Sequence, residues 1–410
     1  MKGGPVLNSS DSDPDAVTAR APLRTLAILS ASSLTLLALG AVAPSLPAIE
    51  LAYADWPDAA LLTRLVLTIT ALFMAFSAPL AGLLVDRIGR KPVLLSALIL
   101  YLVSGTAGIW LEGLTELLVS RVVLGIASGM ILTAATTLIG DYYRGAARNR
   151  MAGAQISVMI FAVATGTTVA GFLADTDWRL PFYLYLAGLI VLPLVVFCVR
   201  EPVRMKSAAP RRGLFAPGNR FPVLRAVLIY VLICVSMLST FMIPSQVPFL
   251  LPEIGIPAAA VAGIAIAVFN AIGALTAMAF RRLRERFDNN AILVGTYLFL
   301  GTGLLLAGTA DSVEQAMLGM VFAGIGFGPL MPTFYAWLLS IAPLDMRGRF
   351  VGGLTFFQFL GIFASPLYSQ PLADRIDLTG AFALTGLAQI ALGLAFAGAA
   401  ISAVFLTRPQ

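Results

Sequence analysis

Twelve long apolar stretches constrain the fold of this chain more than any other feature. A helix needs about 20 apolar residues to cross the hydrocarbon core of a bilayer. Only helices and closed barrels satisfy every backbone hydrogen bond in lipid, and runs of this length exclude barrel strands. The sequence therefore predicts an all-α polytopic membrane protein with twelve transmembrane helices. The stretches lie at 25–48, 61–84, 92–111, 116–139, 151–173, 180–199, 223–251, 257–280, 290–310, 315–340, 350–372 and 379–406.

The composition agrees with a chain whose main partner is the lipid bilayer. Hydrophobic residues make up 59% and charged residues 12% of the sequence, whereas a soluble domain is about 25% charged. So few charges could not cover a water-facing surface. The third and fourth stretches, like the eleventh and twelfth, are joined by very short connections, so the count of twelve depends on separating these two pairs.

The positive charges fall in alternate connections. If the N-terminus is cytosolic, 23 of the 27 Lys and Arg residues lie in segments on the inner side of the membrane. Retention of Lys and Arg in the cytosol sets the orientation of membrane helices. We therefore expect a bacterial inner-membrane protein with both termini in the cytoplasm. The four exceptions are Arg64, Arg121, Arg179 and Arg375.

The chain repeats itself at an offset of 199 residues. Gly125 and Gly129 recur as Gly324 and Gly328, and Leu173 to Asp175 recurs as Leu372 to Asp374. An even number of spans in each half gives both halves the same orientation, so the repeat is parallel. We predict a disordered polar tail at 1–22, a six-helix bundle at 23–200, a basic linker at 201–222 and a second six-helix bundle at 223–410.

The connection between the second and third stretches carries an ordered motif. It reads Gly82-Leu-Leu-Val-Asp-Arg-Ile-Gly-Arg-Lys91, which closely resembles the cytoplasmic loop signature of the major facilitator superfamily of transporters. The resemblance extends over nearly the whole chain from residue 24. It implies the fold of that superfamily, in which two six-helix halves enclose a substrate site near the middle of the membrane.

In the family, this loop signature latches the outward-facing state. Glycines let the backbone approach closely, Asp86 can face the positive N-terminal end of a helix in the other half, and Arg90 can reach Asp141. The alternative is a solvated turn that only sets topology. The corresponding segment 281–288 keeps its basic residues but lacks the Gly and Asp framework, so the latch is expected on one side only. Its expected members are Gly82, Asp86, Arg87, Gly89, Arg90 and Asp141.

Arg121 is the main candidate for contact with a substrate. It begins Arg-Val-Val-Leu-Gly125, which resembles the fourth-helix Arg-x-x-x-Gly signature of the drug-exporting branches. Arginine within a membrane costs about 2.5–3.5 kcal/mol on insertion scales, so it should face a cavity or a partner. The alternatives are snorkelling of Arg121 to the outer surface or an ion pair with Glu50. For Arg64, snorkelling is the favoured interpretation.

Other candidates are polar or aromatic residues near the middle of the predicted helices. Each has ordinary helix packing as its alternative. In the fifth helix, Gly166-Thr-Thr-Val-Ala-Gly171 retains only part of the antiporter signature Gly-Pro-x-x-Gly-Gly. The polar candidates for substrate binding are Gln155, Gln246, Asn270 and Gln358, and the aromatic candidates are Phe327, Tyr335, Phe356 and Phe357.

Chemistry other than transport has no support in the sequence. The chain has no histidine, which removes the commonest general base and metal ligand, and it has no phosphate-binding Gly-x-x-x-x-Gly-Lys-Ser/Thr loop. We therefore expect no enzyme activity, cofactor, metal or nucleic-acid partner. Cys198 and Cys234 both lie in apolar runs and are interpreted as core residues.

No acidic residue occupies the centre of a predicted helix. Proton coupling would then use a protonatable substrate or one of the acids near the helix ends, namely Glu50, Asp86, Glu112, Glu116 or Asp141. A cavity with Arg and amide groups but no central acid favours a neutral or anionic organic compound.

We expect a monomeric secondary transporter that resembles the drug/metabolite:proton antiporter branch and works by proton-coupled efflux. The alternative is a facilitator or proton symporter that imports a small organic anion. A receptor or scaffold would not explain the loop signature and the repeat.

Overall fold

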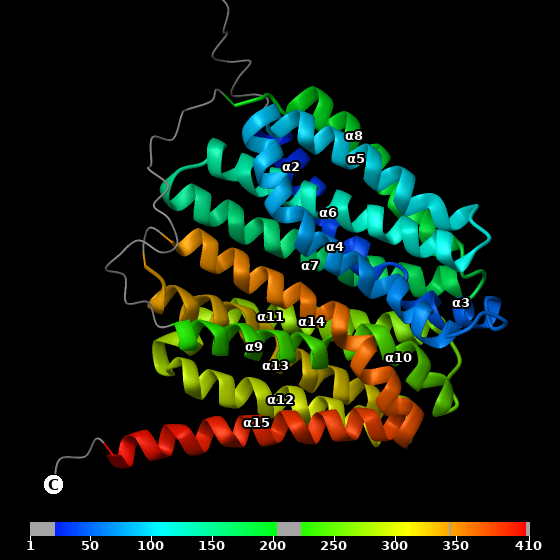
Figure 1. Cartoon of the computed structure of the whole chain (residues 1–410), viewed down its shortest axis with the longest axis vertical. Coiled ribbons are helices and arrows are strands. Elements are labelled where there is room, and N and C mark those ends of the chain that lie inside the picture. The colour runs from blue at the N-terminus through cyan, green and yellow to red at the C-terminus, as the bar shows by residue number, and fades with distance from the viewer. Residues whose placement is uncertain (1–20, 203–222, 344–345, 407–410) are drawn as a thin grey trace, which may run out of the picture.

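The computed structural model describes residues 21–202, 223–343 and 346–406. Residues 1–20 of the predicted tail (1–22) and residues 203–222 of the predicted linker (201–222) lie outside the described residues. The described chain consists of helices joined by short connections (Figure 1). We call residues 21–202 the N-terminal half and residues 223–406 the C-terminal half.

The N-terminal half contains seven α-helices and three short 3-10 segments among its described residues. In chain order they are α2 (Ala21–Gly40), η1 (Ala43–Ser45), α3 (Leu46–Ala52), α4 (Ala59–Ile88), α5 (Arg90–Thr106), η2 (Ala107–Ile109), α6 (Leu114–Tyr142), α7 (Gly145–Ala174), η3 (Leu180–Leu186) and α8 (Ala187–Cys198). The C-terminal half contains α9 (Val223–Thr240), α10 (Met242–Glu253), α11 (Ala259–Arg286), α12 (Asn289–Gly308), α13 (Val313–Ile341), α14 (Arg347–Ile376) and α15 (Leu378–Leu406).

These elements form twelve helical segments that are long and apolar enough to cross a membrane. The prediction of an all-α fold with twelve transmembrane helices is therefore confirmed, including the separation of the two closely joined pairs. A loop after η2 separates α5 from α6, and Asp377, with a positive φ of 63°, separates α14 from α15. The first and seventh spans are broken, near Pro44 and at Phe241, so each consists of two helices.

The same offset of 199 residues relates the helices of the two halves. Shifted by 199, the bounds of α6 become 313–341, which are the bounds of α13. The breaks in the first and seventh spans also correspond, because position 42 maps onto Phe241. The sequence repeat is thus a repeat of helix order and of helix breaks.

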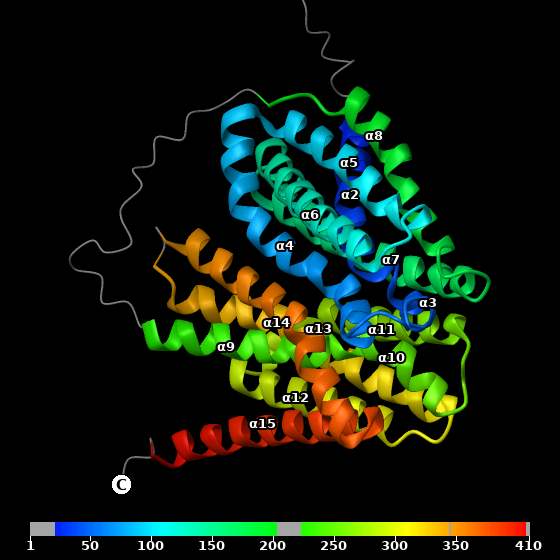
Figure 2. The same ribbon diagram turned by 45° about the vertical axis from the view of Figure 1, so that its right-hand side comes forward.

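The two halves meet along four long helices. The pairs α7 with α11 and α4 with α14 are in contact, and in both ribbon views these helices lie in the middle of the molecule (Figures 1 and 2). By contrast, α5 and α8 lie on one outer edge and α12 and α15 on the other. Side chains on α4, α7, α11 and α14 are therefore placed to form a site between the halves.

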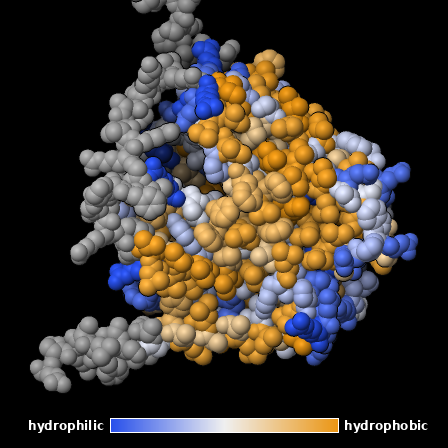
Figure 3. Space-filling model, viewed as in Figure 1, coloured by the Kyte–Doolittle hydropathy of each residue, from blue (hydrophilic) through white to orange (hydrophobic). Residues whose placement is uncertain are grey.

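The surface is hydrophobic around the middle and hydrophilic at two opposite ends (Figure 3). Large apolar side chains such as Leu224 and Phe197 are 82% and 75% exposed, as expected of side chains that face lipid. We call the two hydrophilic ends the basic end and the acidic end. The basic end carries Arg87, Arg90, Lys91, Arg144, Arg148, Arg150, Arg281, Arg282, Arg284, Arg286, Arg347 and Arg349, and the acidic end carries Glu50, Asp55, Asp58, Glu112, Glu116, Asp175, Asp177, Glu253, Asp311, Glu314, Asp374 and Asp377.

Candidate functional site

At the acidic end, α7 and α11 touch backbone to backbone. A Cβ atom on Gly263 would lie 2.5 Å from the carbonyl oxygen of Thr167 and 3.1 Å from the Cα of Gly171. A Cβ on Gly171 would lie 2.8 Å from the carbonyl oxygen of Ala259. Only glycine fits at such distances, so this contact holds the two halves together without room for a side chain.

A carboxylate reinforces the same contact. Asp175, which follows the last residue of α7, accepts hydrogen bonds from the backbone N–H groups of Ala259 (2.6 Å) and Ala260 (3.3 Å). These two residues begin α11, so the negative charge lies at the positive end of that helix. Asp175 belongs to the repeated Leu-Ala-Asp of the sequence, which does not predict its contact with the other half.

Arg64 closes the acidic end between α4 and the C-terminal half. Its Nη1 lies 2.6 Å from Oε2 of Glu50 and donates to the carbonyl of Ala60 at 2.7 Å. Its Nε donates to Oε1 of Gln246, in the other half, at 2.8 Å. Arg64 is only 5% exposed, so the expectation that it snorkels to the surface is wrong. Glu50 pairs with Arg64 and not, as the alternative for Arg121 required, with Arg121.

The contacts of Arg64 continue into the C-terminal half. The ring of Phe249 lies 3.7 Å from the guanidinium carbon, at cation–π distance. The hydrogen-bond network continues from Gln246 to α14, because Nε2 of Gln246 donates to the hydroxyl of Ser369 at 2.7 Å. Gln246 and Ser369 are fully buried. Gln246, which was expected to bind substrate, therefore takes part in closing the acidic end.

Near the basic end, three glycines of these helices have open space beside them. A Cβ atom on Gly82 of α4, Gly153 of α7 or Gly352 of α14 would meet nothing within 4 Å. The two ends therefore differ: helices of the two halves are in contact at the acidic end, whereas positions on α4, α7 and α14 near the basic end are unobstructed. We interpret this difference as a gap between the halves that opens toward the basic end.

The residues of the loop signature lie at the basic end of the N-terminal half. The expected ion pair is present, with Nε of Arg90 at 2.9 Å from Oδ2 of Asp141. Gly89 connects α4 to α5 with a φ of 120°, a conformation that favours glycine. Asp86 and Arg87 are exposed.

Glu201, near the end of the N-terminal half, holds this loop in place. Its two carboxylate oxygens accept hydrogen bonds from the backbone N–H groups of Arg90 and Lys91, both at 2.8 Å. These N–H groups belong to the first turn of α5, where a negative charge is favourable. Glu201 and the Arg90–Asp141 pair thus hold the loop within one half, and Glu201 was not predicted.

Arg121 lies inside the N-terminal half, away from the gap between the halves. Its Nη2 donates to the carbonyls of Ser104 (2.7 Å) and Gly105 (3.0 Å) in the last turn of α5. The rings of Phe182 and Tyr185 lie 5.1 and 5.3 Å from the guanidinium carbon. This placement differs from the cavity-facing one that we expected, because the last carbonyls of a helix need donors.

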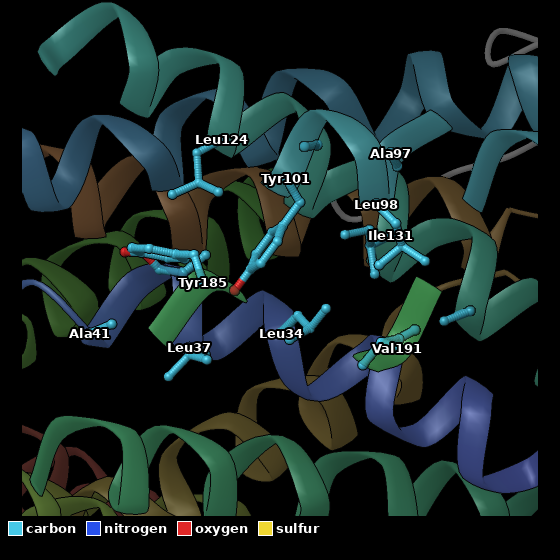
Figure 4. Packing of buried hydrophobic residues seen from close by; sticks show 14 of the residues in the cluster. Leu34, Leu37, Ala41, Ala97, Leu98, Tyr101, Leu124, Ile131, Tyr185 and Val191 are labelled. Atoms are coloured by element: carbon cyan, nitrogen blue, oxygen red, sulfur yellow. The ribbon is translucent and has the colours of Figure 1, made fainter. Parts of the chain in front are cut away.

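The surroundings of Arg121 are tightly filled. It is 1% exposed, and Tyr101 and Tyr185 are fully buried. Their rings meet edge to face with centroids 5.7 Å apart. Figure 4 shows Tyr101 and Tyr185 side by side, with Leu34 and Leu37 of α2 below them in the view. Arg121 therefore joins α5, α6 and η3 within one half.

The remaining polar candidates are dispersed and do not form one cluster. Gln155 donates to the hydroxyls of Ser32 (2.9 Å) and Thr136 (3.2 Å) inside the N-terminal half. Asn270 donates to the carbonyl of Ile266 on its own helix at 2.9 Å. Gln358 is half-buried on α14. Gln155 thus links α2, α6 and α7, as the helix-packing alternative requires.

Two of the aromatic candidates, Phe356 and Phe357, lie in a row of rings that crosses from one half to the other and also contains Phe76 and Tyr230, which were not predicted. Phe76 of α4 meets Phe356 of α14, with ring centroids 5.4 Å apart. Phe356 meets Phe357 (5.7 Å), and Phe357 stacks on Tyr230 of α9 (5.2 Å). Phe76 is 52% exposed. We call Phe76, Phe356, Phe357 and Tyr230 the aromatic row.

Two further aromatic candidates lie in the C-terminal half. The hydroxyl of Tyr335 is 3.1 Å from that of Thr355, which adjoins Phe356. Phe327 packs on Phe269 with ring centroids 5.0 Å apart. Tyr335 thus joins the surroundings of the aromatic row, whereas Phe327 contacts a core residue of α11. Within the described part of the chain, no group of three or more Cys, Asp or Glu side chains could hold a metal ion.

Comparisons with known proteins agree with this geometry. The family model for the Major Facilitator Superfamily matches residues 28–366. The 3-(3-hydroxy-phenyl)propionate transporter of Escherichia coli K12 is 27% identical over 79% of this chain and 80% of its own length. Multidrug resistance protein 1 of Bacillus subtilis 168 is 26% identical over 78% of this chain and 82% of its own length. The crystal structure of a D-xylose-proton symporter superposes with a TM-score of 0.75 at 16% identity, covering 91% of this chain and 96% of the other.

Proposed function

The chain belongs to the major facilitator superfamily, and we propose that it is a secondary active transporter for small neutral or anionic organic compounds. Its family and its relatives support a multi-pass membrane transporter of the drug or metabolite type rather than an enzyme. We further propose that both of its termini are cytoplasmic, that it works as a monomer, and that protons drive export of its substrate.

One observation carries this proposal: backbone and polar contacts join the two halves at the acidic end, whereas Gly82, Gly153 and Gly352 near the basic end are unobstructed. Gly263 has backbone atoms of α7 within about 3 Å, whereas Gly82 and Gly352 have open space beside them. A carrier of this architecture works by rocking its halves around a central site. The arrangement corresponds to the state that is open to the cytosol, if the basic end is cytosolic as the distribution of Arg and Lys indicates.

The chemistry of the gap favours an aromatic compound. The row from Phe76 to Tyr230 offers ring faces and edges from both halves, and aromatic rings attract one another by about 0.5–1.5 kcal/mol per pair beyond area burial. Among the described residues, the ring contacts of the row include no carboxylate, which favours a neutral or anionic compound over an organic cation. Gln358 and Asn270 are the amides that remain as candidates for polar contact with the compound.

A second candidate function is import of a small organic anion. Arg64 is a cation at the boundary of the gap, and a relative of this chain is described as a 3-(3-hydroxy-phenyl)propionate transporter. Another relative is described as a multidrug resistance protein, which favours export. The two candidates share an aromatic substrate and differ in direction and coupling.

Transport by the purified protein in vesicles tests both candidates. The protein is reconstituted into liposomes, and movement of hydroxyphenylpropionate, benzoate, an uncharged aromatic drug and an aliphatic control acid is followed with and without an imposed proton gradient. We expect transport of at least one aromatic compound, driven by the gradient. Export and import differ in the sign of the gradient that drives accumulation. Absence of movement for every aromatic compound would contradict the proposal.

Neutralising Asp86 is expected to reduce transport several-fold while membrane abundance stays normal. Because α4 lies along α14, closing the basic end would bring Asp86 to the positive N-terminal end of α14. A charge at a helix end contributes about 0.3–1 kcal/mol, so Asp86→Asn weakens the state that is closed at the basic end.

Initial transport rates at equal protein amounts measure the effect of Asp86→Asn. The matched control is Glu285→Gln, because Glu285 is the residue 199 positions further on and its ion pair among the described residues is with Arg281 on its own helix. Unchanged transport in Asp86→Asn would leave the loop as a topological signal only.

Labelling of single cysteines is expected to place the basic end in the cytosol. Cysteines at Arg211, Arg284 and beside either terminus should react with an impermeant thiol reagent only after the membrane is opened, in a background without Cys198 and Cys234. A cysteine at Asp55, on the acidic end, should react in intact cells. Labelling of Arg211→Cys from outside would exclude the six-plus-six topology.

A further inference from the structure

Arg64 is a buried cation whose contacts join the two halves. It is 5% exposed, and its hydrogen bonds go to Glu50 in its own half and to Gln246 in the other. Among the described residues, Glu50 is the one carboxylate within 4.0 Å of it. A buried cation is tolerated when it is paired, and removal of its partner leaves an uncompensated charge. The closed acidic end therefore depends on the charge of Glu50.

The repeat shows that this arrangement belongs to one half only. The residue 199 positions after Arg64 is Gly263, which makes the glycine contact between α7 and α11. The residue 199 positions after Glu50 is Phe249, whose ring lies against Arg64. The two equivalent helix crossings at the acidic end are thus closed differently: one by glycine backbone, and one by the contacts of Arg64 with Gln246 and Phe249.

We propose that Glu50 binds the proton that opens the acidic end of this transporter. The proposal rests on the proposed function and selects one residue among the acids that could couple transport to protons. The side chain of Glu50 is 31% exposed, so water reaches it while Arg64, Gln246 and Ser369 stay buried. Protonation removes the negative charge that compensates Arg64.

Opening then follows from the position of Arg64. Without its counterion, the charged guanidinium is more stable in water than in the closed interface. Hydration of the guanidinium requires α4 to separate from Gln246 and Phe249. Because only the ionised carboxylate makes the ion pair of the closed state, a proton binds more tightly to the open state. By linkage, protons shift the population toward that state and are released when it closes.

Other acidic groups also interact with Arg64, so a test must distinguish their effects from the effect of Glu50. Glu253, at the end of α10, and Asp374, near the end of α14, interact electrostatically with Arg64, and Asp377 interacts with Glu253. Asp175 holds the other crossing through its hydrogen bonds to α11. Among these acids, Glu50 alone pairs with Arg64 directly.

Distances between two spin labels at the acidic end provide the test, and no substrate is required. Nitroxides are attached to cysteines at Ala54 and Pro257, which are exposed and belong to different halves, in protein without Cys198 and Cys234 in lipid nanodiscs. Pulsed dipolar measurements at pH 8 are expected to give one short distance. At pH 4, below the ordinary pKa of a glutamic acid side chain at about 4.3, we expect a second, longer distance to gain roughly two- to threefold in population.

The Glu50→Gln variant should populate the longer distance at both pH values. Replacement of the cation as well, in Glu50→Gln with Arg64→Met, should restore the short distance at both pH values, because no buried charge remains to be hydrated. This double variant also shows that the single variant opens for an electrostatic reason and has not simply misfolded. Glu112→Gln is the matched control, since Glu112 is exposed at the same end and should leave the pH response unchanged.

Three outcomes would overturn the assignment. They are a pH-independent distance in the unmodified protein, an unchanged pH response in Glu50→Gln, and loss of that response in Asp175→Asn or Asp374→Asn instead. Failure of the proposed function would look different, because it would abolish transport in the vesicle assay while the distances still respond to pH through Glu50.

Discussion

Replacement of Gly263 with valine is expected to abolish most transport. The added Cβ would lie 2.5 Å from the carbonyl oxygen of Thr167 and 3.1 Å from the Cα of Gly171. Both are backbone atoms, so no side chain can rotate away, and α7 and α11 must separate. Overpacking of this kind costs about 1–3 kcal/mol, which lowers the population of the closed acidic end by roughly 5- to 150-fold.

Two measurements on Gly263→Val separate a locked transporter from a misfolded one. The spin-label pair at Ala54 and Pro257 should show the longer distance at every pH, and transport of the best compound from the vesicle assay should be nearly lost. Gly295→Val is the matched control, because a Cβ on Gly295 would meet nothing within 4 Å. Normal transport by Gly263→Val would mean that the contact between α7 and α11 is not part of the cycle.

The sequence predicted those features of the fold that depend on local composition. Spans follow from the length of apolar runs, and the equivalence of helices such as α6 and α13 follows from the repeat at 199 residues. The Arg90–Asp141 ion pair was also expected, because the motif placed both residues at neighbouring helix ends. In each case the relevant residues lie in one helix or at the ends of helices within one half.

Contacts between the halves could not be derived in the same way. Arg64 and Gln246 are separated by 182 residues in the sequence, and their contact depends on how α4 and α10 tilt in the closed state. The sequence shows that Arg64 is a cation near a helix end, and this position favours snorkelling. It does not show that Glu50 and Phe249 surround the guanidinium. The repeat did indicate that the two halves differ at this end, since Arg64 corresponds to Gly263 and Glu50 to Phe249.

The misplacement of Arg121 has a similar cause. The cost of a buried arginine correctly predicted that Arg121 has partners, but it did not distinguish a substrate from the carbonyls of Ser104 and Gly105. The deciding feature is the end of α5 at Thr106, which leaves the carbonyls of its last turn without intrahelical donors. Helix ends are the least certain part of an interpretation based on sequence.

Replacement of Arg121 with methionine is therefore expected to destabilise the protein without weakening substrate binding. The guanidinium donates to two carbonyls, and hydrogen bonds from a charged donor contribute about 1.5–3 kcal/mol each. Methionine is the residue at the equivalent position of the other half, Met320, so it suits a buried site on this helix. At roughly 2–4 °C per kcal/mol for a domain the size of one half, we expect the midpoint of thermal aggregation to fall by about 5 °C or more.

Arg121→Lys is expected to restore part of this loss, because lysine keeps the charge and one donor direction but not the planar fork. Substrate affinity in detergent, measured on the folded fraction, should stay within about twofold of the unmodified protein for both variants. If Arg121 faced the substrate instead, Arg121→Met would lower affinity roughly 10- to 100-fold with little change in thermal stability. The two positions of the guanidinium thus predict opposite changes in affinity and stability, so measuring both in one variant decides between capping of α5 and contact with the substrate.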